Sequence, residues 1–307
     1  MTLLRPSPLE KLDHPAARAA GVELYVKRDD LYTLAPGTAL QGNKVRKLTP
    51  VLRAALSAAE KPILVSFGGA YSNHVSALAT AGQVYQLPTH LIIRGEEVDN
   101  PLLQAAEASG AALERVSRSA YRLKNTPDFL AELRSRLANH YQVAESAIWF
   151  IPEGGTMAEG VFSTGEVYRE IVAQLSAAPN YICVSAGTGG TAAGIIRATP
   201  EEVQVEVFPA LKGNWMSTEI ARWLPAGRAY NFKCINDYHF GGYGKFPDSW
   251  LTPTTGLAKR ADIREESLPP LEPIYTAKLF SGVLDRLRGG LYPKGARLVI
   301  VHTGGIY

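Results

Sequence analysis

The chain has 307 residues, a length that suggests two domains or lobes and allows a large buried core. Apolar residues make up 46% and charged residues 20%, and the formal net charge is +3, as in an ordinary globular protein. The small, dispersed charge argues against nucleic-acid binding, and no apolar run approaches the roughly 18 residues that a membrane span needs.

The beginning of the chain and its cysteines predict a cytoplasmic protein. The N-terminal segment carries Pro6 and Pro8 and has no apolar region of the signal-peptide kind. Cys183 lies inside an apolar run and is far in sequence from Cys234, which favours reduced thiols. The histidines show no metal-ligand spacing, so we expect no metal.

Short apolar strands alternate with helical segments along almost the whole chain. Strands are predicted over residues 23–27, 63–67, 90–93, 112–116, 148–151, 181–185, 203–209, 230–234 and 297–302. Helices are predicted over residues 45–60, 72–86, 101–109, 127–141, 161–177 and 276–288. Several strands are continuous apolar runs, so the pattern predicts an α/β fold with mostly parallel sheets and helices on both faces. Residues 236–273 form a long stretch without a clear pattern, and such loops are often functional.

Lys44 lies where an irregular Gly/Pro segment gives way to the helix predicted from Val45. The positive end of the helix dipole and the neighbouring cations Arg46 and Lys47 are expected to lower the pKa of Lys44. A lysine of lowered pKa attacks aldehydes, and the commonest protein use is a Schiff base with pyridoxal phosphate. For this segment taken alone, a solvated surface lysine is the alternative.

Two junctions between a strand and a helix carry glycines and hydroxyl groups. At residues 65–74 the glycines allow a ligand to approach the backbone, and Ser72 either contacts that ligand or only caps the next helix. Residues 187–191 (Gly-Thr-Gly-Gly-Thr) follow a strand directly and predict an anion site made of backbone N–H groups. The second junction also fits the dinucleotide fingerprint, with Glu206 in the next strand, so a nicotinamide-dependent oxidoreductase is the alternative.

Four ordered motifs resemble one enzyme family. They are Lys-Arg-Asp-Asp-Leu at 27–31, Gly-Asn-Lys-Val-Arg-Lys-Leu at 42–48, Tyr-Ser-Asn-His at 71–74 and the loop at 187–191. Together they resemble the family of 1-aminocyclopropane-1-carboxylate (ACC) deaminases and D-cysteine desulfhydrases. These are pyridoxal phosphate enzymes of the tryptophan synthase β fold, or fold type II. Residues 7–12 and 302–305 fit the same family, so the resemblance covers nearly the whole chain.

The resemblance implies a role for each motif. Lys44 would carry the cofactor, Asn73 would contact its phenolic oxygen, and Ser72 would bind the substrate carboxylate or act as a nucleophile. The cofactor phosphate would be held by Gly187, Thr188, Gly189, Gly190 and Thr191. Backbone N–H groups in this role would leave no lysine beside the phosphate. Tyr243 and Tyr275 would lie over the substrate as proton donors or holding groups, and His74 would be structural.

Two positions depart from the family pattern. ACC deaminases carry a glutamate that contacts the pyridine nitrogen, whereas this chain has Thr276 after Tyr275, as in the desulfhydrase branch. A neutral hydroxyl does not keep the pyridine protonated, which weakens the electron sink. That favours expulsion of a thiol over opening of a cyclopropane ring. Tyr71 stands where both branches have glutamine.

The resemblance also implies the architecture and the reaction. We expect a large cofactor-binding lobe of residues 1–45 and 155–307, a small lobe of residues 46–154, and a homodimer. The predicted reaction is β-elimination of D-cysteine, or of a β-substituted D-amino acid, to pyruvate, ammonia and the leaving group. ACC deamination to 2-oxobutanoate and ammonia is the alternative. The only expected partner besides a second copy is a small amino acid, with no nucleic acid and no membrane.

Overall fold

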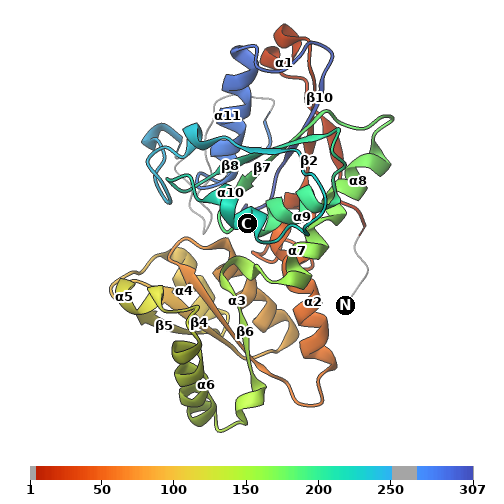
Figure 1. Cartoon of the computed structure of the whole chain (residues 1–307). Coiled ribbons are helices and arrows are strands. Elements are labelled where there is room, and N and C mark those ends of the chain that lie inside the picture. Colours follow the sequence, from red (N-terminus) through yellow and green to blue (C-terminus); the bar gives the residue numbers. More distant parts are fainter. Residues whose placement is uncertain (1–4, 251–267, 307) are drawn as a thin grey trace.

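The protein is built on two β-sheets flanked by helices (Figure 1). The computed structural model describes residues 5–250 and 268–306. Residues 251–267, in the loop predicted over 236–273, lie outside the described residues. The described part of that loop contains two short 3-10 helices, η4 (Asn236–Tyr238) and η5 (Asp248–Trp250).

The larger sheet has six strands in the order β1-β2-β10-β7-β8-β9. They are β1 (Leu9–Lys11), β2 (Glu23–Lys27), β7 (Tyr181–Ala186), β8 (Gln204–Pro209), β9 (Phe232–Cys234) and β10 (Arg297–Val301). All neighbours run parallel except β1, which is antiparallel to β2. In β10, Leu298 pairs with both Leu24 and Tyr181, so the last strand lies between an early and a late part of the chain.

The smaller sheet has four parallel strands in the order β5-β4-β3-β6. They are β3 (Ile63–Gly69), β4 (Thr89–Arg94), β5 (Ala112–Val116) and β6 (Ile148–Ile151). At its carboxyl edge Arg94 pairs with Gly69 on one side and with Val116 on the other. The ends of these strands therefore point toward a common edge, which is where parallel sheets place their ligands.

Helices cover both faces of both sheets. They are α1 (Pro15–Ala20), α2 (Asn43–Ser57), α3 (Asn73–Tyr85), α4 (Pro101–Ala108), α5 (Arg118–Arg122), α6 (Pro127–Tyr141), α7 (Ala158–Thr164), α8 (Glu166–Gln174), α9 (Gly190–Ala198), α10 (Met216–Ala221) and α11 (Thr276–Arg288). Three further 3-10 helices are η1 (Asp29–Leu31), η2 (Glu145–Ala147) and η3 (Glu153–Gly155).

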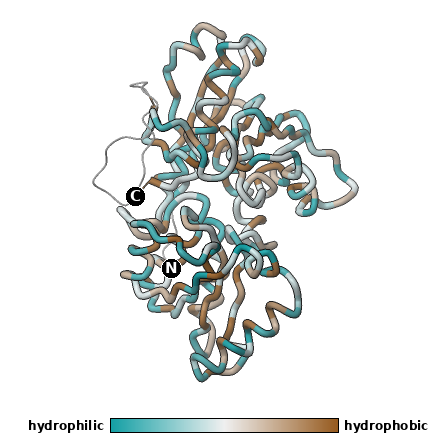
Figure 2. The backbone as a smooth tube through the Cα atoms, turned by 90° about the vertical axis from the view of Figure 1, so that its left-hand side faces the viewer, coloured by the Kyte–Doolittle hydropathy of each residue, from teal (hydrophilic) through white to brown (hydrophobic). Residues whose placement is uncertain are grey.

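Alternate residues of the strands pack against opposite helical layers. In β10, Leu298 and Ile300 pack with α1 and α11, whereas Val299 and Val301 pack with α7 to α10. The smaller sheet lies between α2, α3 and α4 on one face and α5 and α6 on the other. Hydrophobic segments are correspondingly concentrated inside each layered unit (Figure 2). The predicted fold class is confirmed, because strands buried on both faces need apolar side chains at every position.

The predicted elements differ from the structure in three short helices that were not predicted, α1, α5 and α10, in one short strand, and in one helix that is divided. All nine predicted strands exist, but the three-residue strand β1 was not predicted. The helix predicted over 161–177 is two helices, α7 and α8, which meet at Gly165. The hydroxyls of Ser163 and Thr164 donate to the carbonyls of Gly160 and Val161 at 3.0 and 2.9 Å. Such bonds compete with the helical pattern.

Helix α2 connects the two sheets. At its first residue, the Asn43 N–H donates to the Thr303 carbonyl beyond the end of β10, at 3.1 Å. Further along, Leu48 and Leu52 are fully buried in the core of the smaller sheet. From this change of environment we propose a large lobe of residues 1–45 and 155–307 and a small lobe of residues 46–154. Among the described residues, no helix is long and apolar enough to cross a membrane.

Candidate active site

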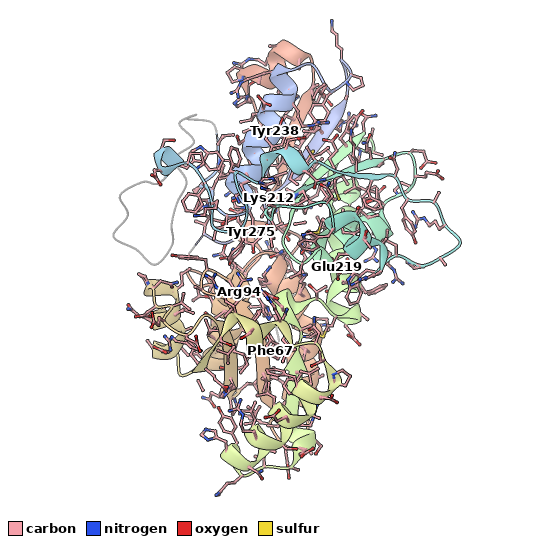
Figure 3. The ribbon with its side chains drawn as sticks, turned by 60° about the vertical axis from the view of Figure 1, so that its left-hand side comes forward. Phe67, Arg94, Lys212, Glu219, Tyr238 and Tyr275 are labelled. Atoms are coloured by element: carbon pink, nitrogen blue, oxygen red, sulfur yellow. The ribbon has the colours of Figure 1, made fainter. Side chains whose placement is uncertain are left out.

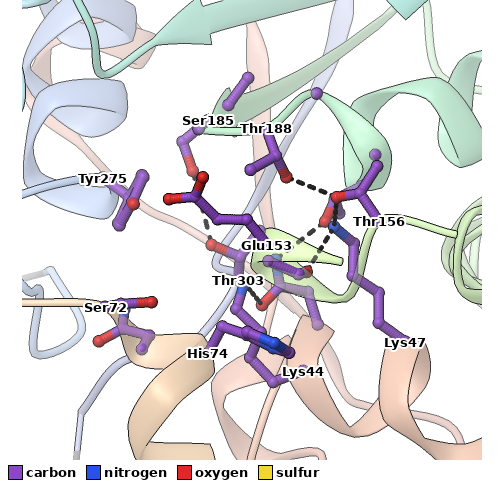
Figure 4. Close-up of a pocket in the computed structure, with 18 of the residues that line it drawn as sticks. Lys44, Lys47, Ser72, His74, Glu153, Thr156, Ser185, Thr188, Tyr275 and Thr303 are labelled. Carbon is purple, nitrogen blue, oxygen red and sulfur yellow. Dashed lines mark hydrogen bonds between the residues drawn. The ribbon is translucent and has the colours of Figure 1, made fainter. Parts of the chain in front are cut away.

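A cavity of about 430 Å³ is lined by the carboxyl ends of strands from both sheets (Figure 4). Gly69 ends β3, Arg94 ends β4 and Ala186 ends β7, and all three line it. The volume lies in the usual range for small-molecule sites, about 300–1,000 Å³. Its position follows the rule that ligands bind at the carboxyl ends of parallel strands.

Residues from distant parts of the sequence meet in this cavity. The predicted site residues that line it are Lys44, Ser72, Asn73, Gly187, Thr188, Gly189, Gly190, Thr191, Tyr243 and Tyr275. They come from the start of α2, the β3–α3 junction, the β7–α9 junction, the segment after η4 and the start of α11. Thr276 and Tyr71 do not line the cavity.

Lys44 lies in the first turn of α2, after Gly42 in a left-handed conformation with φ of 65°. A side chain at Gly42 would collide with the backbone carbonyl of Thr303, so glycine allows α2 to begin against the larger sheet. The Lys44 ammonium donates to the Asn43 side-chain carbonyl at 3.2 Å. Its desolvation in the cavity lowers the pKa of Lys44 to about 8, and the charge of Glu272 opposes part of this shift.

The lowered pKa of Lys44 has a different cause from the one predicted from the sequence. We expected the cations Arg46 and Lys47 and the helix dipole to lower it. Arg46 instead forms ion pairs with Asp29 at 2.6 Å and with Glu170 at 2.8 Å, so its charge is compensated. Burial of the Lys44 ammonium is the largest cause of the lowered pKa.

Lys47 is a site residue that the sequence reasoning missed. Its ammonium donates to the Gly154 carbonyl at 3.0 Å and to the Thr156 hydroxyl at 3.1 Å (Figure 4). A Cβ built on Gly190 would lie 2.9 Å from the Lys47 Nζ, so a lysine does lie beside the predicted phosphate loop. Burial, then the charge of Lys44, lowers the pKa of Lys47 well below its ordinary value. The i, i+3 spacing from Lys44 was the available signal, because it places both side chains on one helix face.

The loop from Gly187 to Thr191 connects β7 to α9 and forms a cradle of small residues. Gly189 is left-handed, with φ of 79°, and precedes the first turn of α9, whose N–H groups lack helical partners. A Cβ at Gly187 would lie 2.9 Å from the ring of Tyr275, so the aromatic side chain lies against the loop backbone. The Thr188 hydroxyl is 2.6 Å from that of Thr156. This arrangement suits a phosphate group.

Ser72 both lines the cavity and caps α3, so the structure does not separate the two roles considered for it. Its Oγ accepts a long hydrogen bond, 3.4 Å, from the Val75 N–H. His74 is buried, and its Nε2 lies 2.7 Å from the Ser66 hydroxyl, which donates to the Ile151 carbonyl. Because that hydroxyl proton is already used, Nε2 is the donor and Nδ1 carries no proton. Burial lowers the pKa of His74 well below its ordinary value, so the ring is neutral.

Tyr243 and Tyr275 form an edge-to-face pair on the cavity wall, with ring centroids 6.3 Å apart. Burial raises the pKa of both phenols above their ordinary value. Both therefore keep their protons near neutral pH and act as hydrogen-bond donors. The pair comes from segments separated by the long loop, and both side chains line the same cavity.

Glu272, the acid whose charge acts on Lys44, is also a residue that the sequence reasoning missed. It is 4% exposed, and its carboxylate accepts the N–H groups of Ile274, Tyr275 and Thr276 at 2.7–2.9 Å. A Cβ at Gly305 would lie 2.6 Å from the Asn73 amide and 2.8 Å from the Glu272 side chain. The Thr276 hydroxyl donates to the Glu272 carbonyl at 3.1 Å and accepts from its N–H at 2.9 Å. That hydroxyl therefore holds the Glu272 turn.

Three cavity-lining residues have a buried polar atom without a protein partner among the described residues. They are Gln41 through its Oε1, His74 through its Nδ1 and Trp223 through its Nε1. Buried polar atoms are nearly always hydrogen-bonded in folded proteins. Their common location indicates that a polar ligand or water completes the site.

The dinucleotide alternative finds no support in the geometry. Glu206, the acid it needs for a ribose hydroxyl, is 2% exposed and does not line the cavity. Its carboxylate accepts from Arg286 at 2.7 Å and from the Tyr292 hydroxyl at 2.6 Å. Both partners lie on the face covered by α11, so Glu206 stabilises the core of the larger sheet.

Known proteins resemble the chain in sequence and in fold. The profile of the family described as "Pyridoxal-phosphate dependent enzyme" matches residues 1–216. The 1-aminocyclopropane-1-carboxylate deaminase of Bradyrhizobium diazoefficiens is 26% identical over 98% of this chain and 92% of its own length. The bifunctional D-cysteine desulfhydrase/1-aminocyclopropane-1-carboxylate deaminase of Arabidopsis thaliana is 27% identical over 98% of this chain and 76% of its own. The crystal structure of an ACC deaminase homologue superposes with a TM-score of 0.77 at 25% identity, over 98% of this chain and 90% of that one.

Proposed function

We propose, from the premise that this chain belongs to the family of pyridoxal-phosphate dependent enzymes, that it eliminates the β-substituent of a small D-amino acid, with D-cysteine as the foremost substrate. The products would be pyruvate, ammonia and sulfide. One observation carries the proposal. Lys44, with its pKa lowered to about 8, shares a cavity with an anion cradle and two protonated tyrosines.

The residues of the cavity fit pyridoxal phosphate. Residues 187–191 and Lys47 would hold the phosphate, since they combine unpaired N–H groups with an ammonium. Lys44 would carry the aldehyde carbon, and Asn73 would bind the phenolic oxygen. The buried polar atoms without protein partners support this fit, because a polar ligand satisfies them. When bound, pyridoxal phosphate supplies an electron sink for the substrate α-carbon.

Other side chains of the cavity would transfer the proton, donate to the departing group and bind the substrate carboxylate. Lys44, with a pKa of about 8, accepts a proton from the α-carbon and returns it near neutral pH, which is the range that favours general acid–base catalysis. Tyr243 and Tyr275 keep their protons and donate to the departing group or hold the substrate. Ser72 binds the substrate carboxylate at the start of α3, where the helix dipole favours an anion.

ACC deamination is the second candidate, and the position of Glu272 favours it. Thr276 supplies no carboxylate to the site, which supports elimination of a good leaving group over ring opening. Glu272, however, is a buried acid whose charge acts on Lys44 and whose side chain lies beside the same glycine as Asn73. A carboxylate at this depth supplies part of the negative charge that the neutral Thr276 lacks.

The test is a parallel assay of D-cysteine, β-chloro-D-alanine and ACC, with release of 2-oxo acid as the readout. We expect pyruvate from the first two and little 2-oxobutanoate from ACC. Efficient ACC opening with Thr276 intact would reverse the order of the two candidates. Borohydride reduction and peptide mapping provide the control, and a phosphopyridoxyl label on any residue other than Lys44 would contradict the assignment. We also propose a cytoplasmic homodimer, which fractionation and sedimentation test.

A further inference from the structure

Arg94 is a cation of the cavity wall that none of these roles uses. It ends β4 at the carboxyl edge of the smaller sheet, beside Gly69, and its side chain is exposed to the cavity. Figure 3 shows it at the top of the small-lobe sheet, on the side that faces Tyr275 of the other lobe. It therefore lies where a ligand held between the two lobes meets the smaller sheet.

Two aromatic rings lie near the guanidinium of Arg94, the buried Tyr121 of α5 and the cavity-lining Tyr243. Its Cζ is 5.8 Å from the ring centroid of Tyr121 and 6.0 Å from that of Tyr243. A Cβ built on Gly69 would lie 3.6 Å from the Arg94 Nη2 and 3.7 Å from the Tyr243 hydroxyl. Two hydrogen-bond donors thus converge over a residue without a side chain, since Tyr243 keeps its proton.

Three other charged residues that line the cavity, Lys124, Glu153 and Glu219, already have ion-pair partners. The Lys124 ammonium pairs with Glu153 at 3.4 Å, and Glu219 pairs with Arg222 at 2.8 Å. The guanidinium of Arg94, in contrast, has no ion pair and no hydrogen bond within residues 5–250 and 268–306. Arginine in a donor-rich cavity matches the planar geometry of a carboxylate or a similar oxyanion.

We propose that Arg94, together with the Tyr243 hydroxyl, forms a subsite for a second anionic group, carried by the side chain of the substrate. The inference rests on the proposed function, because Ser72 takes the α-carboxylate in that proposal and leaves Arg94 for another anion. Within the proposed class of β-substituted amino acids, those whose β-substituent is negatively charged then bind more tightly, and D-cysteine gains from the subsite only as its thiolate. Neutral β-substituted amino acids react but bind less well.

Aspartate and asparagine form a matched pair of probes for this subsite. They have nearly the same shape, differ by one charge and lack a good leaving group on the β-carbon. Calorimetry on the holoenzyme, with each enantiomer, should show aspartate binding about 10- to 100-fold more tightly than asparagine, the range expected for a hydrogen bond to a charged group. The preference should disappear in Arg94→Met and return in part in Arg94→Lys. It should also fall as salt is raised.

Arg136→Met is the control variant. Arg136 also belongs to the small lobe but pairs with Glu114 on the outer face, at 2.7 Å, and does not line the cavity. Its removal should leave the aspartate preference unchanged. Thermal unfolding of each variant shows whether the fold is intact.

Three results would overturn the subsite. They are equal affinities for the two probes in the unaltered enzyme, an equal weakening of both in Arg94→Met, and the same loss of preference in Arg136→Met. The second result would assign Arg94 to the α-carboxylate. Release of pyruvate from β-chloro-D-alanine is measured separately, because it tests the proposed elimination without a charged side chain. A clear aspartate preference without that release would contradict the proposed function and leave the subsite standing.

Discussion

Arg46 and Lys47 are consecutive residues of α2, yet carboxylates neutralise the charge of Arg46 and none among the described residues pairs with Lys47. Arg46 is neutralised by Asp29 and Glu170, and the ring centroid of Tyr32 lies 4.0 Å from its guanidinium carbon. Glu170 also pairs with the buried Lys27 at 2.7 Å. Two cations and two anions thus form a closed group without net charge.

Lys47 and Lys44 turn toward the cavity and have no carboxylate within ion-pair distance among the described residues. Burial without a partner lowers the pKa of both ammonium groups. Paired burial of charge contributes to the architecture of a protein, whereas unpaired burial marks sites of chemistry or ligand binding. One turn of α2 therefore carries both the lysines that line the cavity, Lys44 and Lys47, and the arginine that stabilises the surrounding structure, Arg46.

The largest expected effect is the loss of activity when Lys44, the buried lysine with the proposed catalytic role, is replaced. Lys44→Ala should lower kcat for pyruvate release by at least about 10⁴-fold, since it removes both the cofactor attachment and the proton carrier. The melting temperature of the apoenzyme should not fall, because the lost ammonium was desolvated and unpaired. A variant with more than a hundredth of the original activity would show that another residue does the chemistry.

The next largest effect is a loss of stability when Arg46, the ion-paired residue of α2, is replaced. Arg46→Met leaves the buried Asp29 and the partly buried Glu170 with too few cations, which should lower the free energy of unfolding by about 3–5 kcal/mol. Urea unfolding measures this loss. Arg115→Met is the control, because its ion pair with Glu107 at 2.9 Å is partly exposed and is worth less than about 1 kcal/mol. Lost activity with unchanged stability would place Arg46 on the functional side instead.

The strands and the position of Lys44 could be predicted from the sequence because both depend on local pattern. Continuous apolar runs identify doubly covered strands, and the Gly-Asn-Lys motif identifies the lysine. The division between Arg46 and Lys47 could not be predicted, because it depends on partners far away in sequence. Glu170 lies 124 positions from Arg46, and Gly154 lies 107 positions from Lys47, so each reaches its partner only through the folded chain.

Glu272 was missed for a related reason. As a sequence feature it is one of 29 acidic residues, and only its position in the fold, beside Gly305, distinguishes it. Thr276 is the opposite case, a residue predicted to contact the cofactor that does not line the cavity. The motif assigned its hydroxyl to a cofactor, whereas the fold surrounds it with the Glu272 backbone.

A smaller effect is expected for Lys47, which lies beside the loop proposed to bind the phosphate. Lys47→Met should weaken pyridoxal phosphate binding about 10- to 100-fold, as expected for loss of a charge-assisted hydrogen bond. Binding of pyridoxal, which has no phosphate, should change little, so the ratio of the two affinities is the measurement. Lys278→Met is the matched control, because Lys278 is also buried but donates to the Ala210 and Gly242 carbonyls outside the phosphate loop. An equal loss for both ligands would mean that Lys47 only supports the fold.

The smallest expected effect is a shift in the pKa of Lys44 when the charge of Glu272 is removed. The charge of Glu272 raises the pKa of Lys44 against the larger effect of burial, so Glu272→Gln should move that pKa below about 8. The measurement is the rate of reductive methylation of Lys44 in the apoenzyme against pH, followed by mass spectrometry. The midpoint of this curve should fall to lower pH.

Glu153→Gln is the matched control for that shift. Glu153 is also an acid of the cavity wall, but it pairs with Lys124 and does not contribute to the shift at Lys44. Its midpoint should stay near that of the unaltered protein. A midpoint that rises or stays in Glu272→Gln would mean that Lys44 does not sense the buried acid. The pKa of Lys44 would then depend on burial alone. No carboxylate would act on Lys44, whereas two carboxylates neutralise Arg46.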